Sequence, residues 1–515
     1  MSASSTKPAV LALLALAFLL NACQFNVGTV EAHLVYTNNP DRDPLDRDIV
    51  RTLRLRIEGD GMDSMETEFS LISGDSKALT DVPLGKNRIL TIEGLDTAGN
   101  VRSRGVSAPF STRSGKTKVY IYFSLVEKFS DPPSVFQEEE WNSQYRTDMT
   151  VPRAFHTTTL LPDDTVLVVG GTTAPVPGDY LGRVSNADRT AERFMITPCA
   201  FILEKEPPDC TSGRLCMRKE GGRAHHSAEL LPGGTHVVVA GGEPVDSYEE
   251  WPAEYYCIET RSFESKIGMI NRTRHASAVL TGSREGLVIA GGEGQLASDL
   301  LGSIELFEAG DFENLSPKVL SVPRTGAVAV AFPDLVVFIG GWTAPNQTSS
   351  VVDVIHFDQD PPEIDSFDMH YERAGHTAVV GDLGAVHVCG GLRYVGGVPE
   401  VVEYCEALNP EAKTSTEYTG IRRWGHTATI LQDGRMLLAG GFSSMPPTLA
   451  ENSAVLFDTP VGTGSRKTIP MVSKRVGHTA TLLSNGMVVL IGGVSSADTV
   501  EPASQDYEIF NPRPQ

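Results

Sequence analysis

The sequence predicts an all-β protein in which seven repeated four-stranded units follow a small β-sandwich. An arginine that begins a β-rich run is followed 16 to 19 residues later by a Gly-Gly pair, and this pattern occurs seven times. Successive arginines lie 70, 49, 52, 49, 50 and 52 residues apart, and a period near fifty indicates an array of supersecondary units. Residues 28–127, ahead of the array, alternate between polar and apolar side chains, which is typical of strands with one buried face.

Each repeat is marked by an arginine, a histidine three positions later in all but one copy, and the glycine pair. The arginines and histidines are Arg153, His156, Arg223, His226, Arg272, His275, Arg324, Arg373, His376, Arg423, His426, Arg475 and His478. In the fourth copy Ala327 replaces the histidine. A ring of histidine metal ligands is one interpretation. Because these residues recur at one place in every unit, we instead expect structural roles, with bonds to backbone carbonyls at the junctions between units.

The copy that begins at Arg423 shows how a unit forms. Residues 423–431 predict one strand, Asp433-Gly434 a turn, and residues 435–439 a second, nearly uncharged strand that ends at the glycine pair. Residues 454–458 predict a third strand, and the more polar stretch after them a fourth. Four such strands cannot bury a core alone, so neighbouring units must stack radially.

This repeat resembles that of bacterial kelch-repeat β-propellers, whose motif reads R-x-x-H-T-A-x-L-L-x-x-G-x-V-L-V-x-G-G. The resemblance implies a seven-bladed kelch-type β-propeller over residues 135–515, of the galactose oxidase-like superfamily but without its copper site. The family's outer-strand tryptophan is mostly missing. After the last glycine pair the chain has room for a third strand, residues 507–511, but not for a fourth. We expect residues 135–146 to complete the last blade and so close the ring.

The N-terminus has the pattern of an exported, lipid-anchored protein. Residues 9–20 are an apolar run too short to span a bilayer and typical of a signal-peptide core. Leu20-Asn21-Ala22-Cys23 resembles a bacterial lipobox, which implies that Cys23 is lipid-modified; an ordinary secretory signal is the alternative. We expect a signal peptide over 1–22, a lipidated tether over 23–30, and a membrane-anchored lipoprotein of the bacterial cell envelope, in the outer membrane and facing either the periplasm or the outside.

The segment before the array is expected to form a separate domain. Residues 31–127 contain five short strand patterns and resemble, loosely, immunoglobulin-like or transthyretin-like accessory domains that serve as spacers or adhesion modules. Residues 128–134 are expected to be the linker to the propeller. The acid-rich cluster over 41–48 lacks the pattern of a calcium loop and predicts a solvated loop. The formal net charge of −22 argues against a nucleic-acid partner.

Six cysteines remain once Cys23 is assigned to the lipid, and an even number in an exported protein permits disulfides. Cys389 and Cys405 lie on neighbouring strands of one predicted unit and are expected to pair. Pairing among Cys199, Cys210, Cys216 and Cys257 stays open, and a zinc site is the second interpretation.

Function is expected from the variable loops that follow the glycine pairs, because such loops on a rigid scaffold usually carry binding. Their aromatic and arginine side chains are typical interface anchors, and the alternative is that they only cover the end of the ring. The candidates for a binding face are Tyr180, Tyr248, Trp251, Trp342, Arg393, Tyr394 and Phe442.

The sequence contains no nucleophile elbow, phosphate-binding loop, zinc-protease motif or sialidase box, so no catalytic residue, metal or cofactor is expected. The resulting hypothesis is a lipid-anchored envelope protein that presents a kelch propeller to a protein or glycan partner. A carbohydrate-active enzyme of the sugar isomerase or hydrolase type is the alternative, because sialic acid epimerases are kelch propellers too. A purely structural envelope component is the third interpretation.

Overall fold

The structure, a computed structural model, describes residues 27–37, 39–71, 78–133, 145–173, 184, 187–196, 199–202, 215–217, 221–243, 253–294, 299–381, 384–445, 450–458, 465–496 and 503–514. Throughout these residues the chain is built from β-strands and one short 3₁₀ turn, η1 (Pro40–Arg42), so the all-β prediction is confirmed. No helix of the described part is long and apolar enough to cross a membrane. The chain divides into two compact units, residues 1–126 with 196–199 and residues 127–195 with 200–515.

The first unit contains two sheets that enclose a common core. The smaller sheet, in the order β4-β1-β8, contains β1 (Val27–Val35), β4 (Leu79–Pro83) and β8 (Gly115–Tyr122). The larger, in the order β3-β2-β5-β6-β9 with β7 beside β5, contains β2 (Thr52–Glu58), β3 (Met65–Ser70), β5 (Gly85–Leu95), β6 (Val101–Val106), β7 (Phe110–Thr112) and β9 (Ser124–Leu125). Leu55 and Ile57 of β2 alternate with exposed residues and pack against Val119 and Ile121 of β8, as the period of two requires.

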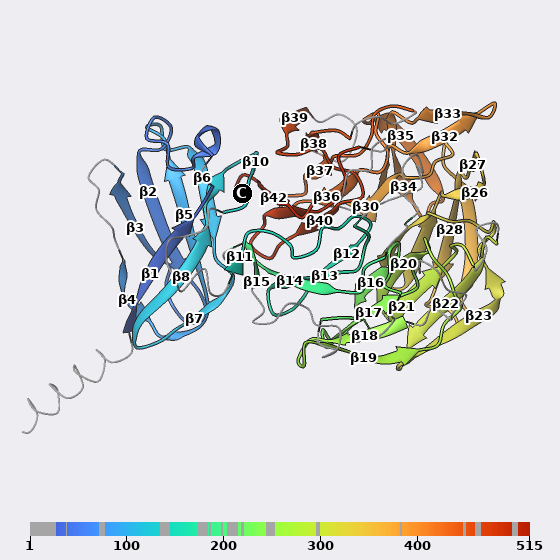
Figure 1. The fold of residues 1–515 in the computed structure, drawn as a ribbon, viewed down its shortest axis with the longest axis horizontal. Coiled ribbons are helices and arrows are strands. Elements are labelled where there is room, and N and C mark those ends of the chain that lie inside the picture. Colours follow the sequence, from blue (N-terminus) through green and yellow to red (C-terminus); the bar gives the residue numbers. More distant parts are fainter. Residues whose placement is uncertain are drawn as a thin grey trace, which may run out of the picture. The chain divides into compact units, whose positions relative to one another are not determined.

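The second unit contains, among its described residues, seven antiparallel sheets of four or five strands, numbered here one to seven along the chain (Figure 1). Sheet one contains β11 (Tyr145–Arg146), β12 (Thr157–Leu160), β13 (Thr165–Val169), β14 (Ala191–Met195) and β15 (Ala200–Ile202). Sheet two contains β16 (Ser227–Leu230), β17 (His236–Ala240), β18 (Ala253–Cys257) and β19 (Ser262–Ile267). Sheet three contains β20 (Ala276–Thr281), β21 (Glu285–Ala290), β22 (Ser303–Glu308) and β23 (Asp311–Val319). In each, the strand that follows the repeat arginine is the first, and the strand that ends at the glycine pair is the second.

Sheets four to seven repeat this order. Sheet four contains β24 (Val328–Phe332), β25 (Leu335–Ile339), β28 (Val351–His356) and β29 (Glu363–Asp368), and sheet five contains β30 (Thr377–Val380), β31 (Val386–Cys389), β34 (Tyr404–Asn409) and β35 (Thr414–Thr419). Sheet six contains β36 (Thr427–Ile430), β37 (Met436–Ala439), β38 (Ser453–Phe457) and β39 (Arg466–Pro470). Sheet seven contains β40 (Thr479–Leu482), β41 (Val488–Ile491), β42 (Tyr507–Asn511) and β10 (Lys128–Ser130). Two hairpins follow glycine pairs, β26 (Trp342–Ala344) with β27 (Gln347–Thr348) and β32 (Leu392–Val395) with β33 (Val398–Val401).

One backbone hydrogen bond joins every sheet to the next. The N–H of the second glycine of a pair donates to the carbonyl of the repeat arginine in the following sheet, as in Gly171 to Arg223 at 2.7 Å and Gly391 to Arg423 at 2.8 Å. The same bond connects the last sheet with the first, because the Gly493 N–H donates to the Arg153 carbonyl at 2.8 Å. The Thr158 and Thr481 hydroxyls, 2.8 Å apart, join β12 and β40 at the same junction, where the two strands lie side by side in Figure 1.

The glycine pair is required by the closeness of this junction. Gly390 and Gly391 have φ of +62° and +103°, a region that side chains of L-residues rarely adopt. A Cβ on Gly390 would overlap the Arg423 carbonyl and lie 2.9 Å from the His426 ring, and one on Gly391 would lie 3.0 Å from the His376 Cβ. The arginine, the histidine and the glycines therefore recur together because they meet at each junction.

The last sheet is completed by a different segment from the one expected. β10, within the predicted linker, pairs antiparallel with β42 and aligns Phe129 with Phe510, whose rings lie 5.2 Å apart. Phe129 is buried, and this burial explains why so short a strand suffices. Residues 135–146 were expected to close this sheet, but the last two of them form β11, which pairs with β15 of sheet one, so that prediction is wrong for β11. Residues 135–144 lie outside the described part, as do residues 1–26 with Cys23.

Gly390→Ala is expected to lower the free energy of unfolding much more than Gly396→Ala. The two glycines share nearly the same φ, +62° and +60°, so each alanine takes on similar backbone strain of about 1–2 kcal/mol. Only Gly390 faces a junction, whereas a Cβ on Gly396 meets no atom within 4 Å. Equal losses in denaturant titrations of the two variants would contradict a close-packed junction.

Candidate functional site

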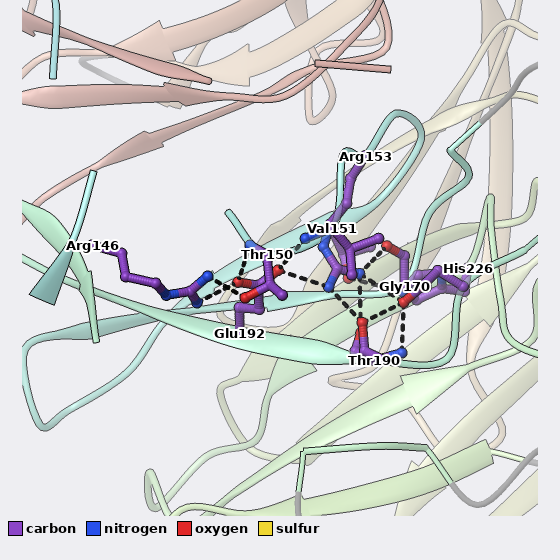
Figure 2. Close-up of polar contacts among 10 residues, drawn as sticks. Arg146, Thr150, Val151, Arg153, Gly170, Thr190, Glu192 and His226 are labelled. Atoms are coloured by element: carbon purple, nitrogen blue, oxygen red, sulfur yellow. Dashed lines mark hydrogen bonds and ion pairs between the residues drawn. The ribbon is translucent and has the colours of Figure 1, made fainter. Parts of the chain in front are cut away.

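The side chains of the repeat arginines form ion pairs within their own sheets. In sheet one, Arg153 is fully buried and donates to the Gly170 carbonyl at 2.8 Å and to the Glu192 carboxylate at 3.0 Å (Figure 2). Glu192 lies on β14 and also accepts the N–H of Thr150 at 2.7 Å. The arginine thus connects the end of the second strand to the third strand, and the carboxylate holds the loop that leads to the arginine.

Five further sheets contain the same arginine–carboxylate pair, although Arg324 donates to the Phe338 carbonyl at 3.1 Å and not to a glycine carbonyl. The pairs are Arg223 with Glu254, Arg272 with Glu305, Arg324 with Asp353, Arg373 with Glu406, and Arg475 with Glu508. Sheet six differs, since Val455 takes the place of the acid and Arg423 donates instead to the Ser453 hydroxyl at 2.7 Å. The bonds to glycine carbonyls agree with the expected junction role, but the carboxylate partners escape the sequence analysis.

The repeat histidines connect first strands of neighbouring sheets. The Nε2 atom of His226 lies 2.9 Å from the Thr157 hydroxyl, and that of His426 lies 2.9 Å from the Thr377 hydroxyl. Burial, together with the neighbouring arginine, lowers the pKa of His156 and of His426 to about 3, so both are neutral at pH 7. Buried neutral rings spread over the junctions fit a structural role rather than a metal centre.

A second set of equivalent positions, two residues after each repeat arginine, forms what we call the inner ring. Its members are Phe155, His225, Arg274, Gly326, Gly375, Gly425 and Gly477, and all have φ between +52° and +66°. Backbone hydrogen bonds join five of the successive pairs, as in Phe155 N–H to the Gly477 carbonyl at 2.8 Å and Arg274 N–H to the His225 carbonyl at 3.1 Å. Four positions are glycine, as this backbone conformation favours, and three are not.

The three exceptions are neighbours and carry chemically different side chains. A left-handed backbone costs a residue with a Cβ on the order of 1–3 kcal/mol, and such strain often marks a functional position. The Phe155 and His225 rings lie 4.7 Å apart. Arg274 is buried, and its guanidinium lies 2.8 Å from the Glu243 carboxylate and 3.6 Å from that of Glu293. Sheets one to three therefore supply an aromatic ring, an imidazole, a cation and two carboxylates at consecutive ring positions.

The residue after each glycine pair forms a bridge with the residue after each repeat arginine, and we call these seven residues the outer ring. They are Thr172, Glu243, Glu293, Trp342, Leu392, Phe442 and Val494. The outer ring is polar in sheets one to three and apolar in sheets four to seven. Trp342 covers the inner-ring glycine of its own sheet, where a Cβ on Gly326 would lie 2.6 Å from the indole. The two rings together define a polar half and an apolar half.

The predicted binding-face residues that the structure describes, Trp342, Arg393, Tyr394 and Phe442, differ in their exposure. Tyr180, Tyr248 and Trp251 lie outside the described residues. Phe442 is buried against Trp424, with ring centroids 5.0 Å apart, so it belongs to a core cluster and not to an exposed face. Trp342 is half-buried at the outer ring.

Arg393 and Tyr394 lie on the β32–β33 hairpin and are half-buried. The Arg393 guanidinium binds Glu400 at 3.0 Å and lies 5.2 Å from the centroid of the Tyr371 ring. That ring stacks on Tyr404, with centroids 5.4 Å apart. These contacts order an aromatic and charged surface beside the apolar half of the rings.

The cysteines divide as follows. Cys389 and Cys405 are register partners on β31 and β34 and form a disulfide. Cys216 is also disulfide-bonded, whereas Cys257 carries a free thiol. Cys199 is buried and its thiol donates to the Ile196 carbonyl at 2.9 Å; burial raises the pKa of this thiol.

No protein-family model and no curated protein sequence matches the chain. A solved structure described as "Structure of YjhT" is similar to it, with 12% sequence identity and a TM-score of 0.44. The alignment covers 62% of this chain and 99% of that one.

Glu254→Gln is expected to destabilise the protein by about 3–5 kcal/mol, because it removes a buried negative charge from the buried guanidinium of Arg223. Both side chains are fully buried, with nitrogen and oxygen 2.8 Å apart. Glu400→Gln is the control, since its partner Arg393 is about one-third exposed and such surface pairs contribute less than about 1 kcal/mol. Chemical denaturation of both variants tests this, and losses of similar size would refute the structural role of the buried pairs.

The free energy of unfolding is also expected to decrease as the pH is lowered below 6.5. The histidine pKa, ordinarily 6.5, is lowered to about 3 in the folded protein at His156, His275, His376 and His426. Between these values the unfolded chain binds more protons, so acid favours unfolding. Glu192 and Glu406 keep their charge at about pH 5, because the arginine beside each carboxyl lowers its pKa.

Denaturation of wild type and of His426→Gln at about pH 7.5 and pH 5 measures this effect. The free energy of unfolding lost between the two pH values should be smaller in His426→Gln than in wild type by an amount on the order of 2 kcal/mol. Glu229 acts in the opposite sense, because burial raises its pKa to about 7. Its contribution to the free energy of unfolding is therefore present at pH 5 and is lost as the pH rises through about 7. A wild type as stable at pH 5 as at pH 7.5 would show that the histidines are not buried in neutral form.

Proposed function

We propose that this chain is a lipid-anchored envelope binding protein whose second unit is a seven-bladed kelch-type propeller. The cyclic series of glycine-to-arginine hydrogen bonds and the inner ring support a propeller, because both repeat once per sheet and connect the last sheet to the first. The sequence repeat supports the kelch assignment. The lipobox at Cys23 supports the anchor and an outer-membrane location in a bacterial envelope.

The partner binds at the polar half of the two rings, and the aromatic surface beside the apolar half is its second contact. The observation that carries this proposal is the grouping of the three non-glycine inner-ring residues in consecutive sheets. A purely structural ring would be served by glycine at every position, as in sheets four to seven. Phe155, His225 and Arg274 instead retain side chains at a cost in backbone strain, beside the carboxylates of Glu243 and Glu293.

The partner class that fits this surface is a glycan or a polar protein segment. Aromatic rings stack on sugar faces or on side chains, and paired charges orient hydroxyl or amide groups. The ion pairs of Arg274 and Arg393 are already formed, so the surface is ordered before binding and little side-chain freedom is lost.

A carbohydrate-active enzyme is the second candidate, supported by one observation. Glu243 and Glu293 both approach Arg274, and two carboxylates near one site are the groups that glycoside hydrolysis uses. Hydrolysis of a bound glycan that stops in a Glu243→Gln or Glu293→Gln variant would favour this function over binding alone.

His225→Gly is expected to reduce partner recovery at least several-fold while leaving the free energy of unfolding within about 1 kcal/mol of wild type, because relief of the left-handed strain offsets the lost ring contact. Asn346→Gly is the matched control. Asn346 also has a left-handed φ, +61°, but it lies in the β26–β27 turn outside both rings.

The measurement is crosslinking and co-purification of the tagged full-length protein from membranes of its own organism, with a Cys23→Ser version in parallel. One reproducible partner, lost with His225→Gly and retained with Asn346→Gly, is the expected result. Recovery of the protein alone would refute the binding function. Equal recovery with both variants would move the contact away from the inner ring, and membrane retention of Cys23→Ser would refute the anchor.

A further inference from the structure

Three strands of sheet two bring a histidine, a cysteine and a glutamate together on one face. His236 begins β17, Cys257 ends β18, and Glu264 lies on β19, the three strands adjacent in Figure 1. His236 and Cys257 are register partners across β17 and β18, so their side chains point to the same side. Ser262 is opposite Cys257, and Glu264 is two residues farther along the strand, so it points to that side too.

The potential ligand atoms of these three side chains all lie within 4.8 Å of one another. A tetrahedral Zn²⁺ with ligand distances of about 2.0–2.3 Å holds its ligand atoms about 3.5 Å apart. Small side-chain rotations close this difference, because His236 and Glu264 are only half-buried. Cys257 is buried, with 8% of its surface exposed, and its thiol is free.

Neighbouring groups already orient two of the three side chains. The Nδ1 atom of His236 lies 2.9 Å from the Thr235 hydroxyl, which leaves Nε2 for a metal. The Thr260 hydroxyl donates to one carboxylate oxygen of Glu264 at 3.2 Å, which leaves the second oxygen. The Tyr255 ring meets the imidazole edge to face at 5.5 Å, and its hydroxyl is held by the Gly310 carbonyl. Such outer contacts are typical of metal sites.

We infer that His236, Cys257 and Glu264 form a Zn²⁺ site with a fourth position left to water. One imidazole, one thiolate and one carboxylate suit a cation of borderline softness, whereas Ca²⁺ and Mg²⁺ prefer oxygen ligands alone. Three protein ligands with an open position are the pattern of zinc sites that activate water or accept an external ligand. The site is independent of the proposed partner surface, since none of its residues belongs to either ring.

The test is a Zn²⁺ titration of the purified, metal-stripped full chain against a chromophoric chelator, with Co²⁺ as a spectroscopic substitute. We expect one equivalent of tightly bound Zn²⁺, a sulfur-to-cobalt charge-transfer band, and a higher Tm when Zn²⁺ is bound. Affinity should fall about tenfold or more in Glu264→Gln and His236→Gln, and the charge-transfer band should vanish in Cys257→Ser.

Glu259→Gln is the control, because Glu259 is an exposed acid in the turn between the same strands. It should bind Zn²⁺ as wild type does, and excess Ca²⁺ should not displace the metal. Absence of tight binding would overturn the site. So would equal losses in Glu264→Gln and Glu259→Gln, which would indicate adsorption to an acidic surface. If Cys257→Ser fails to fold, the Glu264→Gln and His236→Gln titrations decide the question.

Discussion

The structure of the second unit depends on the hydrogen bond from the second glycine of each pair to the arginine carbonyl of the next sheet. This bond needs two backbones to approach more closely than any side chain allows, and so it demands the glycine pair. The arginine then acts in two directions. Its carbonyl accepts the N–H from the preceding sheet, while its guanidinium bonds within its own sheet, in six of the seven sheets to a buried carboxylate. Each junction is thereby coupled to the interior of a sheet, and the junction from Gly493 to Arg153 connects the end of the series to its beginning.

The same junction accounts for the candidate site. Because the arginine is fixed, the residue two positions later always reaches the inner ring with a left-handed backbone. Glycine meets this demand in sheets four to seven, and in sheet four the Trp342 ring covers Gly326. In sheets one to three the chain keeps side chains there, together with two outer-ring carboxylates. The repeated scaffold thus carries different side chains in its two halves. The proposed binding function requires such a difference, whereas a purely structural ring would not.

The junction role of the arginines and histidines and the all-β class could be predicted, because the repeat has a period that local pattern reveals. The partners of the histidines could not: His226 and His426 lie beside threonine hydroxyls and not beside the expected backbone carbonyls. The acids escaped because each lies inside an apolar third strand, 39 residues from its arginine in the case of Glu192 and 31 in the case of Glu254. The copy at Arg423, the most regular in sequence, has Val455 there and gives no sign of an acid. β10 has three residues, too few for a periodic signal. Phe442 was expected on a surface because an aromatic residue in a loop gives no indication of the Trp424 ring that buries it.

The central claim, that a partner contacts the polar half of the inner ring, is tested most directly by photocrosslinking in living cells. A photoreactive amino acid would replace Phe155 in one version of the full-length protein and Asn346 in another, both residues with a left-handed backbone. The account predicts a discrete adduct on irradiation of the Phe155 version and none from the Asn346 version. Adducts from Asn346 alone, or from neither position while other surface positions crosslink, would contradict it.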